Sequence, residues 1–162
     1  MSLLPVDLIN REAVYHPGVV FLPFHMEHLD KVKDSNPEIL SLSKGVNMRT
    51  MIQAQSEMGV ALTAFLYGTP VAILGCVMCW EGVGEMWMLI DQKARSIPVA
   101  MTKSALRMCD IFEIYLHLHR LQITVRKQDR RAVRWAQRLG FNTEGLMLKY
   151  GPDQSDFYLM AR

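Results

Sequence analysis

Apolar side chains are densest in residues 84–91, Gly-Glu-Met-Trp-Met-Leu-Ile-Asp, which predict a buried strand. A polar loop follows at 92–100, and apolar positions then recur at helical spacing to about Leu118. Residues 121–125 predict a second strand, followed by a short basic helix. Strand, helix and strand make one βαβ unit with parallel strands and a right-handed crossover. Such a unit places a loop and a helix N-terminus at the carboxyl end of its first strand, where open α/β sheets bind ligands.

The residues before this unit predict a short strand and two helices. Residues 1–17 show weak periodicity, and we expect an N-terminal extension with one or two helical turns. Residues 18–23 favour a strand, and helical spacing follows at 25–33 and 47–58, with a break at Asn36-Pro37. One face of the second helix is expected to carry Met48, Met51, Ile52 and Gln55.

Two hairpins complete the predicted fold. Residues 60–67 and 70–80 predict antiparallel strands joined at Gly68-Thr69. Residues 144–150 and 155–160 predict another pair, joined by turn-forming residues. The order β α α β β β α β α β β predicts an α/β fold with a mixed sheet, in one domain that extends from residue 18 to residue 162.

Composition sets limits on the class of protein. The 162 residues fit one domain, and a net charge of +2 is too small to imply a nucleic-acid partner by itself. Three cysteines lie in apolar segments, and this odd number favours reduced thiols in a cytosolic protein. The N-terminus lacks the pattern of a signal peptide, and no uncharged apolar run reaches about 18 residues. We therefore expect a cytoplasmic protein with no membrane partner.

Two motifs in the βαβ unit lie 34 residues apart, which leaves room for one helix and one strand. The first is Arg95-Ser-Ile-Pro-Val-Ala100, and the second is Asp129-Arg-Arg-Ala-Val-Arg-Trp-Ala-Gln-Arg-Leu-Gly-Phe141. Their order and spacing resemble the GNAT superfamily of N-acetyltransferases, over roughly residues 18 to 162. The stretch 140–145 is similar to the ribosomal-protein-acetyltransferase branch. Trp135 followed by Leu-Gly-Phe is also similar to GNAT-like proteins of short-tailed bacteriophages.

The resemblance implies a single GNAT-like domain, with a mostly antiparallel sheet of about 6–7 strands, splayed central parallel strands and about four helices. It also implies direct transfer of an acetyl group from acetyl-CoA to a primary amine of a protein or a small molecule. A homodimer and a charged tRNA partner remain open. The implied cofactor contacts are the strand backbone at Leu89, Ile90 and Asp91, the pyrophosphate loop at Arg95, Ser96, Ile97, Val99 and Ala100, and Arg130 or Arg131 for the 3′-phosphate. Thr102 or Lys103 are expected to add a side-chain contact to this loop.

Three departures from the family pattern favour a different interpretation. Pro98 replaces a glycine and removes one backbone N–H from the loop. Ala136 replaces the tyrosine that protonates the departing thiolate in many members, and Asp129 replaces an asparagine. The alternative is a catalytically degenerate GNAT-fold protein that serves binding or assembly, in a phage particle for example. If a large side chain such as Trp87 or Met101 fills the slot between the splayed strands, the enzyme hypothesis fails.

Catalysis of amine acetylation needs a base for the amine and an acid for the leaving sulfur. Glu85, near the start of the first central strand, is the first candidate base, and Glu81 is the second; an exposed strand-end carboxylate is the simpler interpretation. Tyr150, in a predicted late strand, is the candidate acid, although a rim tyrosine would look the same.

Other polar clusters have simpler explanations. His25 and His28 share a helical face but lack the further ligands of a metal site, so we expect none. Cys76 and Cys79 form a CxxC pattern inside a strand, where their side chains point to opposite faces. Residues 120–138 carry seven basic side chains and one acidic side chain. That run fits a solvated helix face, a contact to the 3′-phosphate of coenzyme A, or a surface for RNA or an acidic protein, in that order.

Overall fold

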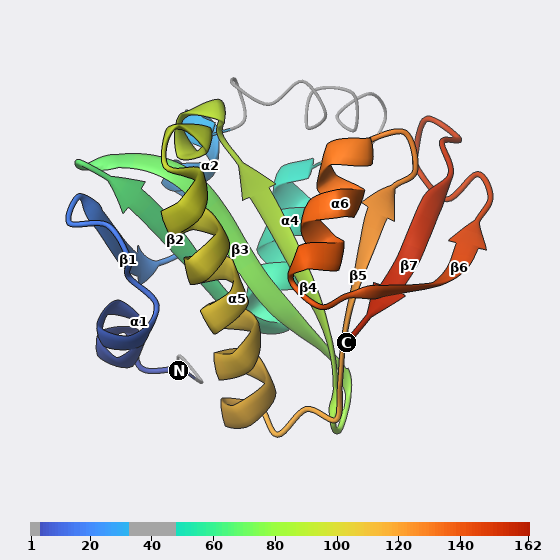
Figure 1. The fold of residues 1–162 in the computed structure, drawn as a ribbon, viewed down its shortest axis with the longest axis horizontal. Coiled ribbons are helices and arrows are strands. Elements are labelled where there is room, and N and C mark those ends of the chain that lie inside the picture. The colour runs from blue at the N-terminus through green and yellow to red at the C-terminus, as the bar shows by residue number, and fades with distance from the viewer. Residues whose placement is uncertain (1–3, 33–47) are drawn as a thin grey trace.

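A seven-stranded sheet forms the centre of the computed structural model, which describes residues 4–32 and 48–162 (Figure 1). The break predicted at Asn36-Pro37 lies outside the described residues. The strand order is β1-β2-β3-β4-β5-β7-β6. The strands are β1 (Val19–Pro23), β2 (Gly59–Leu66), β3 (Thr69–Trp80), β4 (Val83–Ile90), β5 (Arg120–Arg126), β6 (Asn142–Met147) and β7 (Phe157–Ala161). The helices of the described residues are α1 (Val6–Glu12), α2 (Met26–Val32), α4 (Met48–Glu57), α5 (Pro98–Tyr115) and α6 (Arg130–Arg138), with a 3-10 helix, η2 (Gln92–Ser96).

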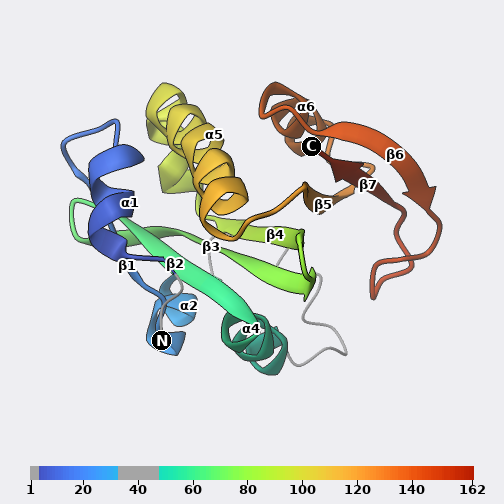
Figure 2. The same ribbon diagram turned by 90° about the horizontal axis from the view of Figure 1, so that it is seen from below.

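Helices cover both faces of the sheet. The helices α1, α5 and α6 lie on one face, and α2 and α4 lie on the other (Figure 2). The larger core lies beneath the first group, where Met108, Phe112 and Phe141 are buried. A smaller core beneath α2 and α4 contains Leu29, Val32, Ile52 and Ile73. No helix in the described ranges is both long enough and apolar enough to cross a bilayer.

The predicted α/β fold with a mixed, mostly antiparallel sheet is confirmed. Every neighbouring pair of strands is antiparallel except β4 and β5, which are parallel as the βαβ unit requires. The predicted elements of the described chain are all present within a few residues of their expected bounds. The boundary expected after residue 17 stays a prediction, although Leu4, Ile9 and Ala13 on that side of it are buried in the larger core.

The first hairpin turns one residue earlier than predicted. Its two loop residues are Tyr67 and Gly68, not Gly68 and Thr69, and both have positive φ angles, 48° and 80°. This backbone suits the twist of a two-residue hairpin. Packing holds Tyr67 in that conformation, since its ring lies against Gly18, where an added Cβ would be 2.6 Å from a ring carbon.

One further prediction about elements is corrected. The strand expected to run to Tyr150 ends at Met147, so Tyr150 lies in the segment that follows it. Apolar periodicity indicates which side chains tend to be buried but does not fix where a short element stops. In α4, Ile52 is buried, while its neighbour Met51 is 38% exposed.

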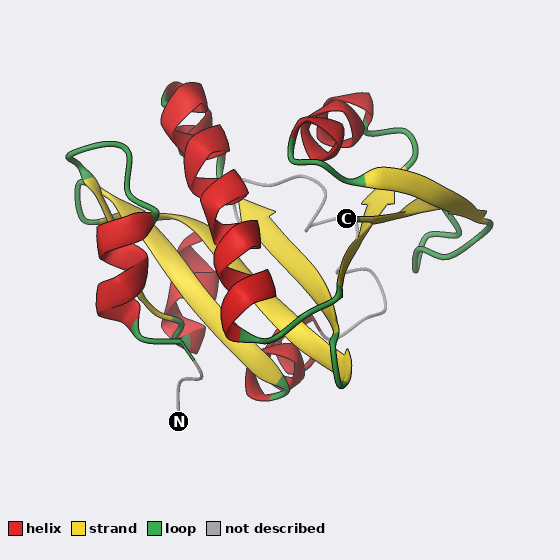
Figure 3. Ribbon diagram, turned by 60° about the horizontal axis from the view of Figure 1, so that its bottom comes forward, coloured by secondary structure: helices red, strands yellow, loops and turns green. Residues whose placement is uncertain are grey.

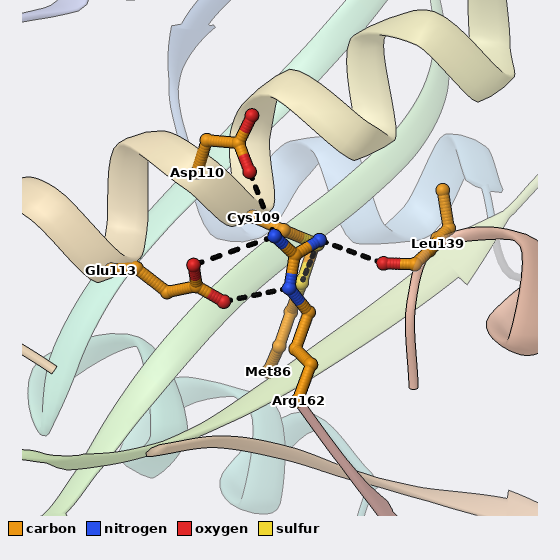
Figure 4. A network of polar contacts seen from close by, with 6 residues as sticks. All are labelled: Met86, Cys109, Asp110, Glu113, Leu139 and Arg162. Carbon is orange, nitrogen blue, oxygen red and sulfur yellow. Dashed lines mark hydrogen bonds and ion pairs between the residues drawn. The ribbon is translucent and has the colours of Figure 1, made fainter. Parts of the chain in front are cut away.

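Arg162, which follows β7, joins two helices of the larger core to the sheet (Figure 4). Its guanidinium donates to Asp110 Oδ1 and to the carbonyl of Leu139, each at 2.7 Å, and its Nε lies 2.7 Å from Glu113 Oε1. Asp110 and Glu113 belong to α5, and Leu139 ends α6. One side chain therefore joins the end of the sheet to two helices.

Candidate active site

The candidate site lies where β4 and β5 part. Their parallel ladder contains three residue pairs and ends with Glu85 opposite Gln122. β4 stays paired with β3 as far as Ile90, and β5 stays paired with β7 as far as Arg126. The two strands therefore keep their outer neighbours while they separate from each other, which gives the V between them in Figure 1. An opened pair of strands offers backbone groups to an extended ligand, as an exposed sheet edge does.

The loop after β4 is more ordered than the sequence predicts. It forms the 3-10 helix η2, which begins at Gln92 and is capped by Asp91. The carboxylate of Asp91 is buried and accepts a hydrogen bond from the backbone N–H of Lys93 at 2.8 Å, while its own N–H donates to Val71 O at 2.8 Å. The side chain of Asp91 thus caps η2, while the predicted contact between its backbone and the cofactor stays a prediction.

Pro98 occupies the first position of α5, where a missing N–H costs the helix nothing. The N–H of Ile97 donates to Ala94 O at 3.3 Å, so it is not available to a phosphate, contrary to expectation. The next two N–H groups, of Val99 and Ala100, make no hydrogen bond within the described residues. Because α5 is 18 residues long, its dipole favours an anion at this end.

The cations near this helix end differ in what they contact. Arg95 is exposed and forms no ion pair with any described carboxylate. Ser96 turns its hydroxyl back to the carbonyl of Lys93 at 2.7 Å. Lys103 places its ammonium group over the ring of Tyr15, 5.9 Å from the ring centre. Arg95 is therefore the cation best placed for an anion at the start of α5.

A hydrogen bond joins α5 and α6 beside the parted strands. The indole N–H of Trp135 donates to Thr102 Oγ1 at 3.0 Å, so the Thr102 hydroxyl already has one partner. Asp129 caps α6 by accepting from the N–H of Ala132 at 3.0 Å, which explains how it can stand in for asparagine. Ala136 is buried in the larger core and supplies no proton.

The two large side chains that could block the slot lie elsewhere or at its border. Trp87 packs with the smaller core on the α2 and α4 face, against Gly75. Met101 borders an apolar cavity of about 60 Å³ between α5 and the sheet, together with Met88 and Ile90. Among the described residues, the indole nitrogen of Trp87 is buried without a hydrogen-bond partner.

Glu85 lies at the vertex of the V and begins a chain of hydrogen bonds. The amide of Gln122 donates to Glu85 Oε2 at 2.9 Å, and Arg120 Nε donates to the other end of that amide at 3.0 Å. Arg120 also donates hydrogen bonds to both carboxylate oxygens of Glu144, at 2.9 and 2.6 Å. These bonds from Arg120 lower the pKa of Glu144, and they raise the pKa of Arg120 in return.

The sequence analysis missed Gln122, Arg120 and Glu144 as partners of Glu85. The signal was present in part, because residues 120–125 alternate polar and apolar side chains, with Arg120 and Gln122 on the polar face. Which residue of β4 lies opposite that face depends on strand register, and a single sequence does not reveal register between distant strands.

Tyr150 does not join Glu85. It follows the edge strand β6, is 52% exposed, and packs edge-on against Phe157, 5.3 Å between ring centres. Phe157 pairs with Arg126, whereas Glu85 pairs with Gln122, four residues earlier in β5. At about 3.3 Å per residue, these levels lie roughly 13 Å apart along the strand. Glu81, the second candidate base, lies in the turn between β3 and β4 and is exposed.

The two arginines proposed for the 3′-phosphate lie on different faces of α6. Arg131 is four residues before Trp135 and therefore shares the face directed at α5. Arg130 lines a separate cavity with Val133 and Arg134, on the face turned away from α5. Arg131 is therefore on the side of α6 that carries Trp135, and Arg130 lines the separate cavity, while a contact of either with the 3′-phosphate stays a prediction.

The histidines and cysteines behave as simple packing groups. His28 Nδ1 lies 2.8 Å from the buried hydroxyl of Thr63, and burial, followed by the charges of His25 and Lys31, lowers the pKa of His28. Cys76 is buried, which raises its pKa to about 12, while Cys79 is exposed, so the two do face opposite ways. The described residues contain no group of three side chains suited to a metal ion.

Solved acetyltransferases share this fold. Ard1 from Thermoplasma volcanium matches with a TM-score of 0.70 at 16% identity, covering 90% of this chain and 97% of its own. A GNAT-family acetyltransferase from Bacillus anthracis matches with a TM-score of 0.66 at 16% identity, covering 92% and 96%. RimL, a ribosomal L7/L12 alpha-N-protein acetyltransferase in complex with coenzyme A, matches with a TM-score of 0.73 at 13% identity, covering 93% and 97%.

The likeness is one of fold. No protein-family model matches the chain, and no curated protein sequence matches it. TM-scores of 0.66 to 0.73 over nearly the whole of both chains show the same three-dimensional arrangement, at identities of only 13 to 16%. The GNAT fold implied by the two motifs is therefore confirmed.

Proposed function

We propose that this chain is an acetyl-CoA-dependent N-acetyltransferase that transfers an acetyl group directly to a primary amine. One observation carries the proposal: β4 and β5 part after three residue pairs, and a carboxylate, Glu85, lies at the point where they part. The fold shared with solved acetyltransferases supports it. So does the position of Trp87, which packs with the smaller core on the α2 and α4 face.

The residues that would hold the cofactor fit its chemistry. Coenzyme A carries a flexible amide-containing arm and a pyrophosphate, and when acetylated it supplies a reactive thioester. The backbone of β4 at Leu89 and Ile90 would pair with the arm. The N–H groups of Val99 and Ala100 and the guanidinium of Arg95 would face the pyrophosphate. Arg131, on the face of α6 shared with Trp135, is our candidate for the 3′-phosphate.

Glu85 would accept the proton of the acceptor amine. Gln122 holds one carboxylate oxygen, Oε2, which would leave Oε1 to accept the proton. Side chains alternate along a strand, so Glu85 shares its face with Trp87, on the side of α2 and α4. The acceptor would therefore approach from that side, while α5 and α6 hold the nucleotide from the other side.

The acid in this reaction would be water. Ala136 has no proton to give, and Tyr150 lies too far along the sheet to reach the level of Glu85. A carboxylate base and a solvent acid suffice when the amine is already well positioned. RimL is a ribosomal L7/L12 alpha-N-protein acetyltransferase. We therefore propose the α-amine or a lysine amine of a protein as the first acceptor class to test here.

Calorimetric titration with acetyl-CoA, on the purified protein and its Arg95→Glu variant, tests the cofactor site. We expect micromolar binding by the wild type and a loss of at least tenfold in the variant, because a charge-assisted contact becomes a repulsion. Arg138→Glu makes the same charge change on the exposed side of α6 and should bind normally. Absence of binding by the wild type would contradict the proposal and leave a GNAT-fold binding protein as the function to pursue.

A further inference from the structure

A second cavity lies on the far side of α6, and the proposed acetyl transfer makes no use of it. Its volume is about 460 Å³, within the range of small-molecule sites. Its lining comes from α6, from the residues that follow β5 and from the start of β7. The residues that matter for its chemistry are Lys127, Gln128, Arg130, Arg134, Asp156 and Tyr158.

The cavity is separated from the groove between the parted strands by α6 itself. Arg130, Val133 and Arg134 have the i, i+3, i+4 spacing of one helical face. Trp135, which donates to Thr102 of α5, follows Arg134 by one residue and is therefore rotated about 100° from it. Figure 3 shows α5 and α6 as neighbours on one face of the sheet, so a ligand between them would contact the Trp135 side of α6.

The charge of the cavity is unbalanced. Lys127, Arg130 and Arg134 form no ion pair within the described chain, although Arg126, next in sequence, is bound to Asp153 at 2.7 Å. Asp156 contributes the one carboxylate, and the backbone N–H of Lys149 already donates to it at 3.0 Å. Three cationic side chains and one anionic side chain leave a formal charge of +2 around one small volume.

The lining also contains neutral hydrogen-bonding groups. Gln128 supplies an amide and Tyr158 a phenol, and Tyr158 packs partly against the larger core, so its position is fixed. A free inorganic ion would use the cations alone. A phosphomonoester joins two negative charges to a polar body, and so matches both the net charge and the neutral groups.

We propose that this cavity binds the phosphate of a small phosphomonoester, independently of the cofactor groove. The cations Lys127, Arg130 and Arg134 bind the phosphate oxygens, and Gln128 and Tyr158 contact the rest of the molecule. The site adds a regulatory or second-substrate position to the fold, on the opposite face of α6 from Trp135.

The test is a titration of the ¹⁵N-labelled full chain with inorganic phosphate and with adenosine 5′-monophosphate, followed by NMR. We expect shifts of amides in residues 127–134 and 156–158, and tighter binding of the nucleotide than of phosphate. Arg134→Gln should weaken binding about tenfold, because one charge-assisted contact is lost. Arg138→Gln makes the same charge change on an exposed residue of this helix outside the cavity. The affinity for the nucleotide should then change by no more than about twofold.

Three results would overturn the proposal. One is the absence of shifts at these residues with either probe. Another is displacement of the nucleotide by saturating coenzyme A, which would assign the cavity to the cofactor. The third is an equal loss of nucleotide affinity in Arg134→Gln and Arg138→Gln, together with binding of an RNA strand that has no terminal phosphate. That result would make this helix an RNA surface instead.

Discussion

Glu85 is the residue on which the proposed chemistry depends, and its surroundings make that dependence measurable. Replacing Glu85 with glutamine keeps the size of the side chain and a partner for Gln122, but removes the base. We expect acetylation to slow by about 10²- to 10⁴-fold, the usual contribution of a general base. The loss of rate would be measured as the release of free coenzyme A thiol from acetyl-CoA, in the presence of an amine that the wild-type protein acetylates.

Two comparison variants make this prediction specific. Gln122→Leu should slow the reaction by about tenfold, since the carboxylate remains but loses the bond that orients it. Glu81→Gln changes an exposed turn residue and should leave the rate nearly unchanged. A Glu85→Gln protein as fast as the wild type would remove Glu85 from the mechanism, whatever the cofactor binding shows.

His28 predicts a dependence of stability on pH. Its pKa is lowered in the folded protein, mainly by burial, so the folded state binds the proton less readily than the unfolded chain does. Its contribution to stability is therefore complete above the unfolded pKa of about 6.5 and is lost as pH falls below it through the folded value. Denaturant unfolding at pH 7.5 and pH 5 should show this decrease in the free energy of unfolding.

The variant His28→Gln can still hydrogen-bond Thr63 but cannot gain a proton, so it should lose that part of the decrease between the two pH values. His119→Gln, at an exposed position, should keep it. An unchanged pH dependence in His28→Gln would assign the effect to another group.

At the scale of elements, the basic helix α6 depends on its cap. Asp129 accepts from the N–H of Ala132, and its negative charge also suits the start of a helix. Asp129→Ala should lower the free energy of unfolding by about 1 kcal/mol, while Asp129→Asn should lose a few tenths at most. Denaturant unfolding of the three proteins would measure both, and equal losses in the two variants would show that charge rather than capping is responsible.

The elements themselves could be read from the sequence, because their apolar periods are strong and their ends carry turn residues. The parallel pair at 84–91 and 121–125 followed from the helix between them. Details that depend on contacts between distant residues could not be read. The Gln122–Glu85 bond depends on strand register, and the Trp135–Thr102 bond depends on how two helices pack. The early hairpin turn depends on the ring of Tyr67 against Gly18.

In the candidate site, too, the sequence predicts which element each residue belongs to but not its local contacts. Glu85 lies in β4, Arg95 in η2, and Val99 and Ala100 at the start of α5, as the predicted order of elements requires, while their roles stay predictions. Ile97 and Tyr150 do not serve as expected, because a hydrogen bond inside η2 and the early end of β6 decide their geometry. Local structure within a loop or at a strand end is set by a few competing contacts of similar strength.

For the molecule as a whole, Arg162 is the residue that joins the end of the sheet to two helices. Its side chain is 17% exposed, and its guanidinium contacts two carboxylates and one carbonyl on α5 and at the end of α6. Arg162→Met fills similar space but leaves these acceptors unpaired, and we expect a loss of about 2–3 kcal/mol in the free energy of unfolding. Arg11→Met breaks a pair that is 72% exposed on the arginine side and should cost close to zero. Equal effects of the two substitutions in denaturant unfolding would contradict this ranking.

The short ladder between β4 and β5 has a mechanical consequence. Three residue pairs join the block formed by β1 to β4 to the block formed by β5 to β7, reinforced by Trp135 on one helix and Arg162 at the last strand. The two halves of the sheet are thus joined by few hydrogen bonds, and a molecule bound between β4 and β5 would restrict their motion relative to each other. Hydrogen–deuterium exchange should then slow in both β4 and β5 when coenzyme A is added, while the outer strands β1 and β6 keep their rates.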